Sequence, residues 1–208
     1  MYYPDFFDEV ETLTLRDPLA SFLGTFSDGQ VNFSYLDVVK AAGHSCPTVA
    51  GAYLMTLTAL SCLYPDSLPV RGDIEVELKE SVDEGTAGVV GSVVAHLTGA
   101  AHEGGFKGVQ GRFSRRCLMR YGADIEGTVR FVRRDNNALI ELSYHPENVP
   151  PDPRQPELMR QIAEGSATEA TIKEFGKIWQ EQVRRILLDN RVREGLFRIV
   201  ALPSSASI

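Results

Sequence analysis

A chain of 208 residues is long enough to form one large domain, or one domain with an appendage. Its 43% hydrophobic and 24% charged residues are typical of a globular protein, and its net charge of -7 argues against a nucleic-acid-binding protein, which is normally basic. Three cysteines without a repeating spacing do not form a disulfide framework and favour the reducing cytoplasm, and the acidic first ten residues lack the basic segment of a secretory signal.

The first third of the chain is predicted to be helical. Asp17 and Pro18 begin a short helix, because an acidic residue caps the N-terminus and proline fits the first position. Ser34 caps a second helix over residues 35–42, which ends at Gly43. Pro47 begins a third helix, whose regular part, residues 48–64, carries no charge. This part is shorter than the roughly 20 residues that cross a bilayer, so we expect a buried central helix and no membrane partner.

After residue 65 the hydrophobic period changes from helical to alternating, as at Ile74, Val76 and Leu78. This pattern predicts strands at residues 74–78, 89–97, 109–120, 128–134 and 138–144, with a tight turn at residues 135–137. We therefore expect an α+β fold in which N-terminal helices pack on an antiparallel sheet of about five strands, together forming a core of residues 1–145.

Prolines separate this core from the last quarter of the chain. Five of them predict an extended linker over residues 146–156, followed by a helical extension over residues 157–208. We expect a short helix closed by Gly165, a capping box of Ser166 and Glu169, a long amphipathic helix from Ile172 to about Asn190, and a last strand at residues 196–201. The long helix suits either packing on its own domain or exchange across the two-fold axis of a homodimer.

The segment with the clearest chemistry is the corner formed by residues 43–47, Gly-His-Ser-Cys-Pro. Pro47 places Cys46 at the N-cap of the third helix, where unpaired backbone N–H groups and the helix dipole favour a thiolate. With the imidazole of His44 two residues away, this thiolate is suited to bind a soft divalent metal or to act as a nucleophile. Cys62 and Cys117 are interpreted as core residues.

The corner and the small-residue helix after it resemble the Gly-His-x-Cys-Pro-Gly segment of the FmdE family, whose members are related to one of the components of formylmethanofuran dehydrogenase. The resemblance extends more weakly to about Tyr121, through Leu97-Thr98-Gly99, a glycine-rich loop and an arginine-bearing strand. It implies a helix-plus-sheet core that holds a metal, zinc or another divalent transition metal, through His44 and Cys46.

The sequence also departs from the family pattern. Ala100 stands where the family has a cysteine, and the chain has no Cys-x-x-Cys pair for the C-terminal zinc finger of some members. Because zinc takes three or four protein ligands, we predict His102, two residues beyond the missing cysteine, as the third ligand. His96 is the competing residue, but it lies in a predicted strand, where a hydrogen-bonded core histidine is the simpler interpretation.

Arginines and lysines are concentrated between residues 107 and 134 of this otherwise acidic chain. One interpretation is a binding site for a small anionic molecule, with Lys107, Arg112 and Arg115 as substrate-binding residues, because guanidinium groups match carboxylates and phosphates. The other is a solvated sheet face whose charges pair with nearby carboxylates.

Three functional hypotheses follow. The resemblance implies a metal-binding protein that acts on a carbonyl or formyl group of an anionic small molecule. The second hypothesis is a metal-free enzyme with Cys46 as the catalytic nucleophile and His44 or His102 as the base. The third is a non-catalytic accessory subunit, in which the corner is structural and the helix that contains Trp179 binds a partner or a second copy.

Overall fold

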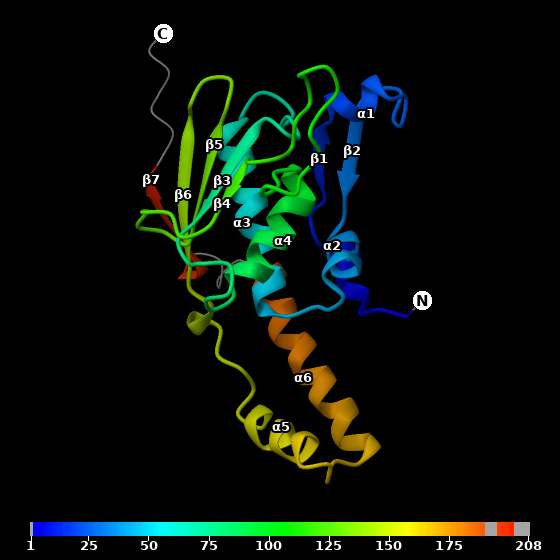
Figure 1. Ribbon diagram of the computed structural model, residues 1–208. Helices are drawn as coiled ribbons and strands as arrows, with labels where there is room; N and C mark the ends of the chain where they lie inside the picture. Colours follow the sequence, from blue (N-terminus) through cyan, green and yellow to red (C-terminus); the bar gives the residue numbers. More distant parts are fainter. Residues whose placement is uncertain (1, 190–194, 202–208) are drawn as a thin grey trace.

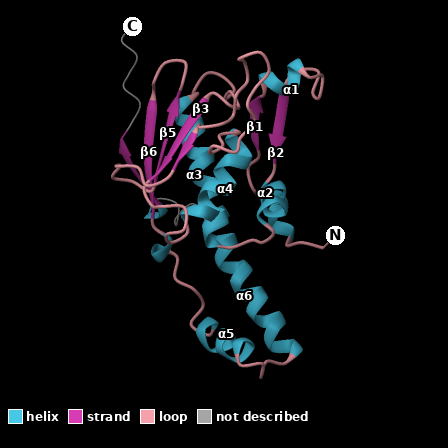
Figure 2. Ribbon diagram, in the orientation of Figure 1, coloured by secondary structure: helices cyan, strands magenta, loops and turns pink. Residues whose placement is uncertain are grey.

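The computed structural model describes residues 2–189 and 195–201, and it confirms the α+β class. Two helices, α3 (Pro47–Leu63) and α4 (Ala87–Thr98), form the central layer. A five-stranded sheet lies on one side of these helices, and a two-stranded sheet with helix α2 (Tyr35–Ala42) lies on the other (Figures 1 and 2). One continuous hydrophobic core joins the layers.

The N-terminal segment contains a 3-10 helix, η1 (Asp5–Glu9), and an antiparallel pair of strands, β1 (Leu13–Arg16) and β2 (Gln30–Phe33). The short helix α1 (Pro18–Phe22) lies between the two strands and is capped by Asp17, as predicted. This strand pair was not predicted, because each strand has only four residues and only β1 buries alternate side chains.

Helices α2 and α3 form as predicted. The Ser34 hydroxyl accepts a hydrogen bond from the Asp37 N–H, and the Asp37 carboxylate accepts one from the Ser34 N–H, which makes a capping box. Gly43 ends α2 with a left-handed backbone, φ 77°. Helix α3 is buried along most of its length, since most of its residues are apolar and none carries a charge.

The main sheet has the strand order β4-β3-β5-β6-β7. Its strands are β3 (Ile74–Leu78), β4 (Met119–Arg120), β5 (Val129–Arg133), β6 (Leu139–Tyr144) and β7 (Phe197–Ala201). Every pair is antiparallel except β3 with β4, which is parallel, so the predicted antiparallel sheet is in fact mixed. The reason is the crossover through α4, since a helix that connects two strands of one sheet returns the chain in the same direction.

Two predicted strands are wrong. Residues 89–97 belong to helix α4, because a continuous apolar run has no period that separates a buried strand from a buried helix. Residues 109–118 form a loop, and only Met119 and Arg120 pair in the sheet. Left-handed φ values at Gln110, Phe113 and Cys117 bend this loop away from a strand. Cys117 lies in this loop and is exposed, so its predicted place in the core is wrong. Cys62 is half-buried and packs against the hydrophobic core.

The C-terminal segment extends from the core and returns to it. The 3-10 helix η2 (Pro146–Asn148), helix α5 (Gln155–Ala163) and helix α6 (Glu169–Leu188) follow β6, and Figure 1 shows α5 and the first part of α6 below the sheet. The end of α6 buries Val183, Ile186 and Leu187 in the same core as α3, and β7 joins the sheet as predicted.

Three details of this segment refine the predictions. The capping box at the start of α6 is formed by Thr168 and Thr171, not by Ser166 and Glu169, because the helix begins at Glu169. The proline-rich linker is fastened to α6, whose Gln182 side chain donates to the Val149 carbonyl at 2.7 Å. Asn190, the predicted end of the long helix, lies outside the described residues.

Candidate functional site

The corner between α2 and α3 has the local structure that its sequence predicts. Gly43 ends one helix and Pro47 begins the next, so residues 44–46 form an irregular segment between them. Cys46 is extended and acts as the N-cap, with its Sγ accepting a hydrogen bond from the Val49 N–H at 3.4 Å. The half-buried sulfur therefore receives one of the free donors of the helix N-terminus.

His44 is exposed and its ring is oriented by the backbone. Its Nδ1 lies 3.0 Å from the Ala42 carbonyl oxygen. Because a carbonyl oxygen can only accept a hydrogen bond, Nδ1 carries the proton, and in the neutral ring Nε2 keeps a free lone pair. Histidines that bind metals commonly show this pattern, in which the second nitrogen donates to a carbonyl and fixes the tautomer.

Helix α6 closes the corner from the other side. The indole Nε1–H of Trp179 donates to the Ser45 carbonyl at 2.9 Å, and the Gln180 amide donates to the same oxygen at 3.2 Å. The Ser45 hydroxyl donates to Gln180 Oε1 at 3.1 Å and lies 2.9 Å from the Tyr35 hydroxyl. Two residues from a helix far later in the chain thus hold the peptide between His44 and Cys46.

Two tyrosine hydroxyls stand near Cys46. The Tyr144 hydroxyl donates to the Pro47 carbonyl at 2.7 Å, and the Tyr35 hydroxyl contacts Ser45. Burial raises the pKa of both tyrosines well above the usual range, and the neighbouring Cys46 raises each pKa further. Both hydroxyls therefore stay protonated at neutral pH and serve as hydrogen-bond donors.

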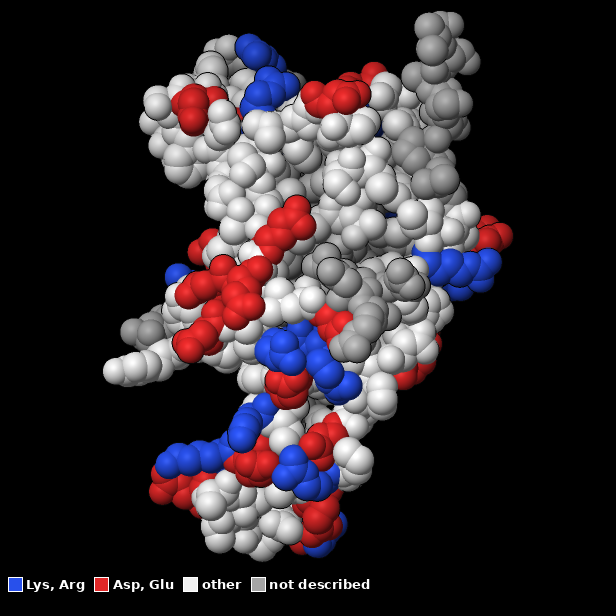
Figure 3. Space-filling view, turned by 180° about the vertical axis from the view of Figure 1, so that it is seen from behind, with Lys and Arg blue, Asp and Glu red and all other residues white. Residues whose placement is uncertain are grey.

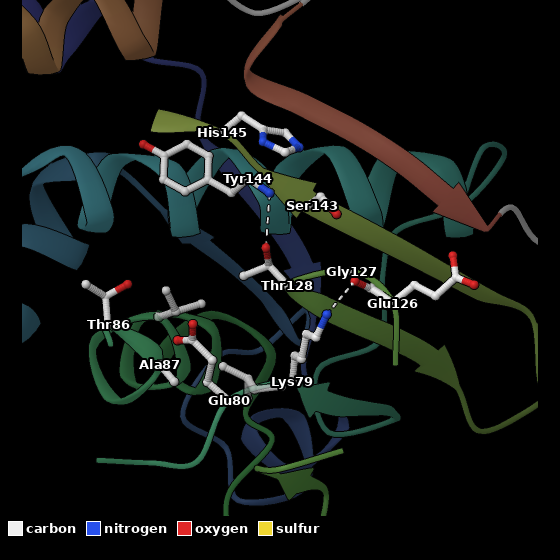
Figure 4. Close-up of a pocket in the computed structure, with 12 residues that line it drawn as sticks. Lys79, Glu80, Thr86, Ala87, Glu126, Gly127, Thr128, Ser143, Tyr144 and His145 are labelled. Atoms are coloured by element: carbon white, nitrogen blue, oxygen red, sulfur yellow. Dashed lines mark hydrogen bonds between the residues drawn. The ribbon is translucent and has the colours of Figure 1, made fainter. Parts of the chain in front are cut away.

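Tyr144 also connects the corner to a cavity of about 170 Å³, shown in Figure 4. The cavity lies between the start of α4, the end of β3 and the neighbouring ends of β5 and β6. Eight of the residues that line it have polar or ionisable side chains: Lys79, Glu80, Thr86, Glu126, Thr128, Ser143, Tyr144 and His145. This volume is smaller than that of a pocket for a drug-sized ligand and suits a small metabolite or part of one.

This cavity was not predicted, because its residues come from four separate segments of the sequence. The available signal was the pair Tyr144 and His145 at the end of a strand and directly before the proline-rich segment. The Tyr144 N–H donates to Thr128 Oγ1 at 3.1 Å, and His145 Nδ1 lies 2.9 Å from a carboxylate oxygen of Glu147. Lys79 donates to the Glu126 carbonyl at 3.2 Å, a hydrogen bond that is drawn as a dashed line in Figure 4.

The structure does not bring the predicted third ligand to the corner. His102 is exposed in the loop after α4, with its ring centre 6.1 Å from that of Tyr121. His96 lies in α4 rather than in a strand, and its ring packs edge-on against Phe33. Within residues 2–189 and 195–201, no three His, Cys, Asp or Glu side chains gather closely enough to hold a metal ion. The set of His44, Cys46 and His102 is therefore not assembled.

The basic residues divide into two groups. On the sheet, Arg130 pairs with Glu77 at 3.0 Å and with Glu141 at 2.8 Å, so this face follows the simpler interpretation of paired surface charges. Arg112 and Arg115 instead line a second cavity, at the C-terminal end of α4. Lys107 is exposed in the same loop and is not among the residues that line this cavity.

No protein-family model and no curated protein matches this chain. In the part of the chain that the structure describes, no helix combines the length and the apolar character needed to cross a bilayer.

Proposed function

We propose that the protein is an FmdE-like metal-binding protein whose corner holds a divalent transition metal, zinc in the first place, through His44 Nε2 and Cys46 Sγ. The observation that carries this proposal is the hydrogen bond between His44 Nδ1 and the Ala42 carbonyl, which leaves Nε2 as a free donor atom two residues from a thiol. The N–H of Val49 supports the sulfur, and α6 fixes the peptide between the two residues.

Two donors fit a soft divalent metal but do not complete its coordination. Zinc in proteins has four ligands as a rule, so the remaining positions fall to water, a substrate or a second copy of the chain. When bound, zinc supplies a Lewis acid that polarises a carbonyl group, which agrees with the carbonyl or formyl substrate that the family resemblance implies. Of the chain's own groups, Tyr35 and Tyr144 hold protonated hydroxyls close to Cys46.

The same proposal includes a homodimer in the cytoplasm. Met159 and Ile172, on the α5–α6 hairpin, are 43% and 53% exposed although both side chains are large and apolar. We propose that a second copy covers these side chains; two corners that met across the dimer axis would supply two imidazoles and two thiols, which match the four-ligand preference of zinc. The three cysteines form no disulfide, which agrees with a reducing compartment.

The direct test is metal analysis of protein purified without chelators. We expect one zinc per chain, or one per two chains if a second copy completes the site, and loss of the metal in His44→Ala and in Cys46→Ser. The matched controls are His102→Ala and Cys62→Ser, which should keep the metal. Absence of stoichiometric metal from the unmodified protein would refute the proposal, and rapid alkylation of Cys46 by iodoacetamide would then favour the cysteine nucleophile.

A further inference from the structure

The second cavity lies near the C-terminal end of α4, because Arg71, one of its lining residues, donates to the His96 and Leu97 carbonyls, whereas the Tyr144 cavity is lined by residues at the start of the same helix. The second cavity has a volume of about 350 Å³. Four guanidinium groups line it, those of Arg71, Arg112, Arg115 and Arg134, together with the carboxylate of Asp73. Such a concentration of arginine is unusual in a chain whose net charge is -7.

The base of this cavity holds more positive than negative charge. Asp17 is 4% exposed, and its carboxylate accepts hydrogen bonds from Arg115 Nη2 at 2.7 Å and from Arg71 Nη1 at 3.0 Å. One carboxylate thus serves two guanidinium groups. Arg115 is itself 7% exposed, and its second terminal nitrogen, Nη1, is buried without a hydrogen-bond partner. An unpaired buried donor on a charged group is costly, and a bound anion would offset that cost.

Two glycines make room for the Arg115 guanidinium. Gly72 and Gly99 both have left-handed φ values, +85° and +73°, and a Cβ on either residue would overlap this group. The loop that carries Arg112 and Ser114 is shaped by a third left-handed residue, Phe113, with φ +61°. Since a left-handed backbone is costly for a side chain as large as phenylalanine, the loop is held in this shape by its surroundings.

The rim of the cavity holds two arginines with weak or no partners. Arg112 lies over the Phe113 ring at 4.8 Å and makes no ion pair within the described part of the chain. Arg134 is 45% exposed and reaches Asp73 and Glu75 only at 3.7 Å and 3.6 Å. Both guanidinium groups are therefore available to a ligand that enters the cavity.

We propose that this cavity binds a small oxyanion, a carboxylate or phosphate group of a metabolite. Four arginines line the site, and the carboxylates of Asp17, Asp73 and Glu75 lie near them, so an excess of about one positive charge is left for a bound anion to neutralise. Guanidinium groups recognise the oxygens of both anions through paired N–H donors. Arg71 and Arg115 form the fixed base, and Arg112 and Arg134 close over the ligand. The site is independent of the corner and of any metal there.

The test measures binding of inorganic phosphate and of succinate to the full chain by isothermal titration calorimetry, at constant ionic strength set with chloride. Saturable binding of either anion at one per chain supports the proposal, and the anion that binds more tightly identifies the class. Arg112→Gln and Arg134→Gln should each weaken the affinity about tenfold, since each removes one charge-assisted contact. These exposed residues are chosen because Arg115 variants disturb the buried network.

Arg116→Gln is the matched control, an exposed arginine from the same loop that does not line the cavity. It should change the affinity less than about twofold, because a distant surface charge is screened by salt. Binding should also persist in Cys46→Ser, which separates this site from the proposed metal site. If neither anion binds, or if Arg116→Gln weakens binding as much as Arg112→Gln does, the proposed oxyanion site is ruled out.

Discussion

Gly51 determines how closely the Tyr144 ring approaches helix α3. The residue is buried in this helix, and a Cβ at this position would overlap the ring of Tyr144. The ring cannot turn away freely, because its hydroxyl donates to the Pro47 carbonyl at 2.7 Å. The absence of one methyl group thus allows β6 to reach the start of α3.

We predict that Gly51→Ala lowers the free energy of unfolding by about 1–3 kcal/mol, because the added methyl group overpacks the contact with Tyr144. Alanine is intrinsically the better helix former by about 1 kcal/mol, so a net loss would show that packing dominates. Urea denaturation measures the change. Gly176→Ala is the control, since nothing lies within 4 Å of its Cβ in α6, and it should stabilise the protein. A Gly51→Ala protein as stable as the Gly176→Ala protein would contradict this interpretation.

At the level of single residues, the sequence predicts those features that depend on neighbouring positions. The cap at Cys46, the left-handed Gly43 and the turn that contains Asn137 follow from local rules and are confirmed. The position of His102 depends on how a long loop folds, and no local rule gives it. The contact of Trp179 with Ser45 joins residues 134 positions apart, so the sequence pattern carried no sign of it.

Asp17 connects three elements. Its side chain caps α1 by accepting hydrogen bonds from the N–H groups of Leu19 and Ala20. It also forms ion pairs with Arg71, in the loop between α3 and β3, and with Arg115, in the loop after α4. Burial by itself raises the pKa of Asp17, but the hydrogen bond from the Ala20 N–H and the charges of Arg71 and Arg115 outweigh burial and hold the pKa below its usual range. The ionised carboxylate therefore stabilises the folded chain.

Because the pKa of Asp17 is lower in the folded protein than in the unfolded chain, its ionised carboxylate stabilises the fold at neutral pH. This stabilisation is lost as the pH falls below about 4 and the carboxylate becomes protonated in the folded protein. We predict that Asp17→Asn, which keeps the cap but removes the charge, destabilises the protein by about 3 kcal/mol at pH 7. The difference from the unmodified protein should shrink as the pH falls below about 4 in urea denaturation. Asp28→Asn, an exposed turn residue of the same hairpin, should have little effect at either pH. A difference for Asp17→Asn that does not depend on pH would contradict the assigned role of the charge.

Most elements with a clear period or cap are predicted correctly, and the longest element that is predicted wrongly, α4, has neither. Strands β3, β5 and β6 alternate polar and apolar residues, and α1, α2 and α3 have capping residues, so all six follow from the sequence. Helix α4 has neither signal, because Thr86 makes no side-chain cap and the residues after it are small and apolar. Because α4 was predicted as a strand, the crossover between β3 and β4 was not recognised, and the sheet was predicted to be antiparallel throughout.

At the scale of the whole molecule, the α5–α6 hairpin is the least supported part of the fold. Helix α5 has no buried residue, and Figure 1 shows the hairpin projecting from the core. Its surface carries ion pairs such as Arg154 with Glu174 and Arg160 with Glu164, and Figure 3 shows the mixed charges over this region. Exposed ion pairs contribute little to stability. Burial of its exposed apolar side chains against another surface would therefore stabilise the hairpin more than these ion pairs do.

We predict that the unmodified protein is a dimer in light scattering after gel filtration, and that the double variant Met159→Lys, Ile172→Lys is a monomer. The introduced charges make burial at an interface costly. Val82→Lys is the control, because Val82 is similarly exposed, at 58%, but lies in the loop before α4. A monomeric unmodified protein, or a double variant that remains a dimer, would exclude this hairpin as the interface.

The contact of α6 with Ser45 also has a consequence for the order of events during synthesis on the ribosome. Trp179 and Gln180 leave the exit tunnel long after His44 and Cys46 have emerged, so the nascent chain carries an unfinished corner for most of translation. At about 5–20 residues per second, that interval lasts several seconds or more. During this time the peptide between His44 and Cys46 lacks the hydrogen bonds that hold it in the folded protein, and only the arrival of α6 supplies them.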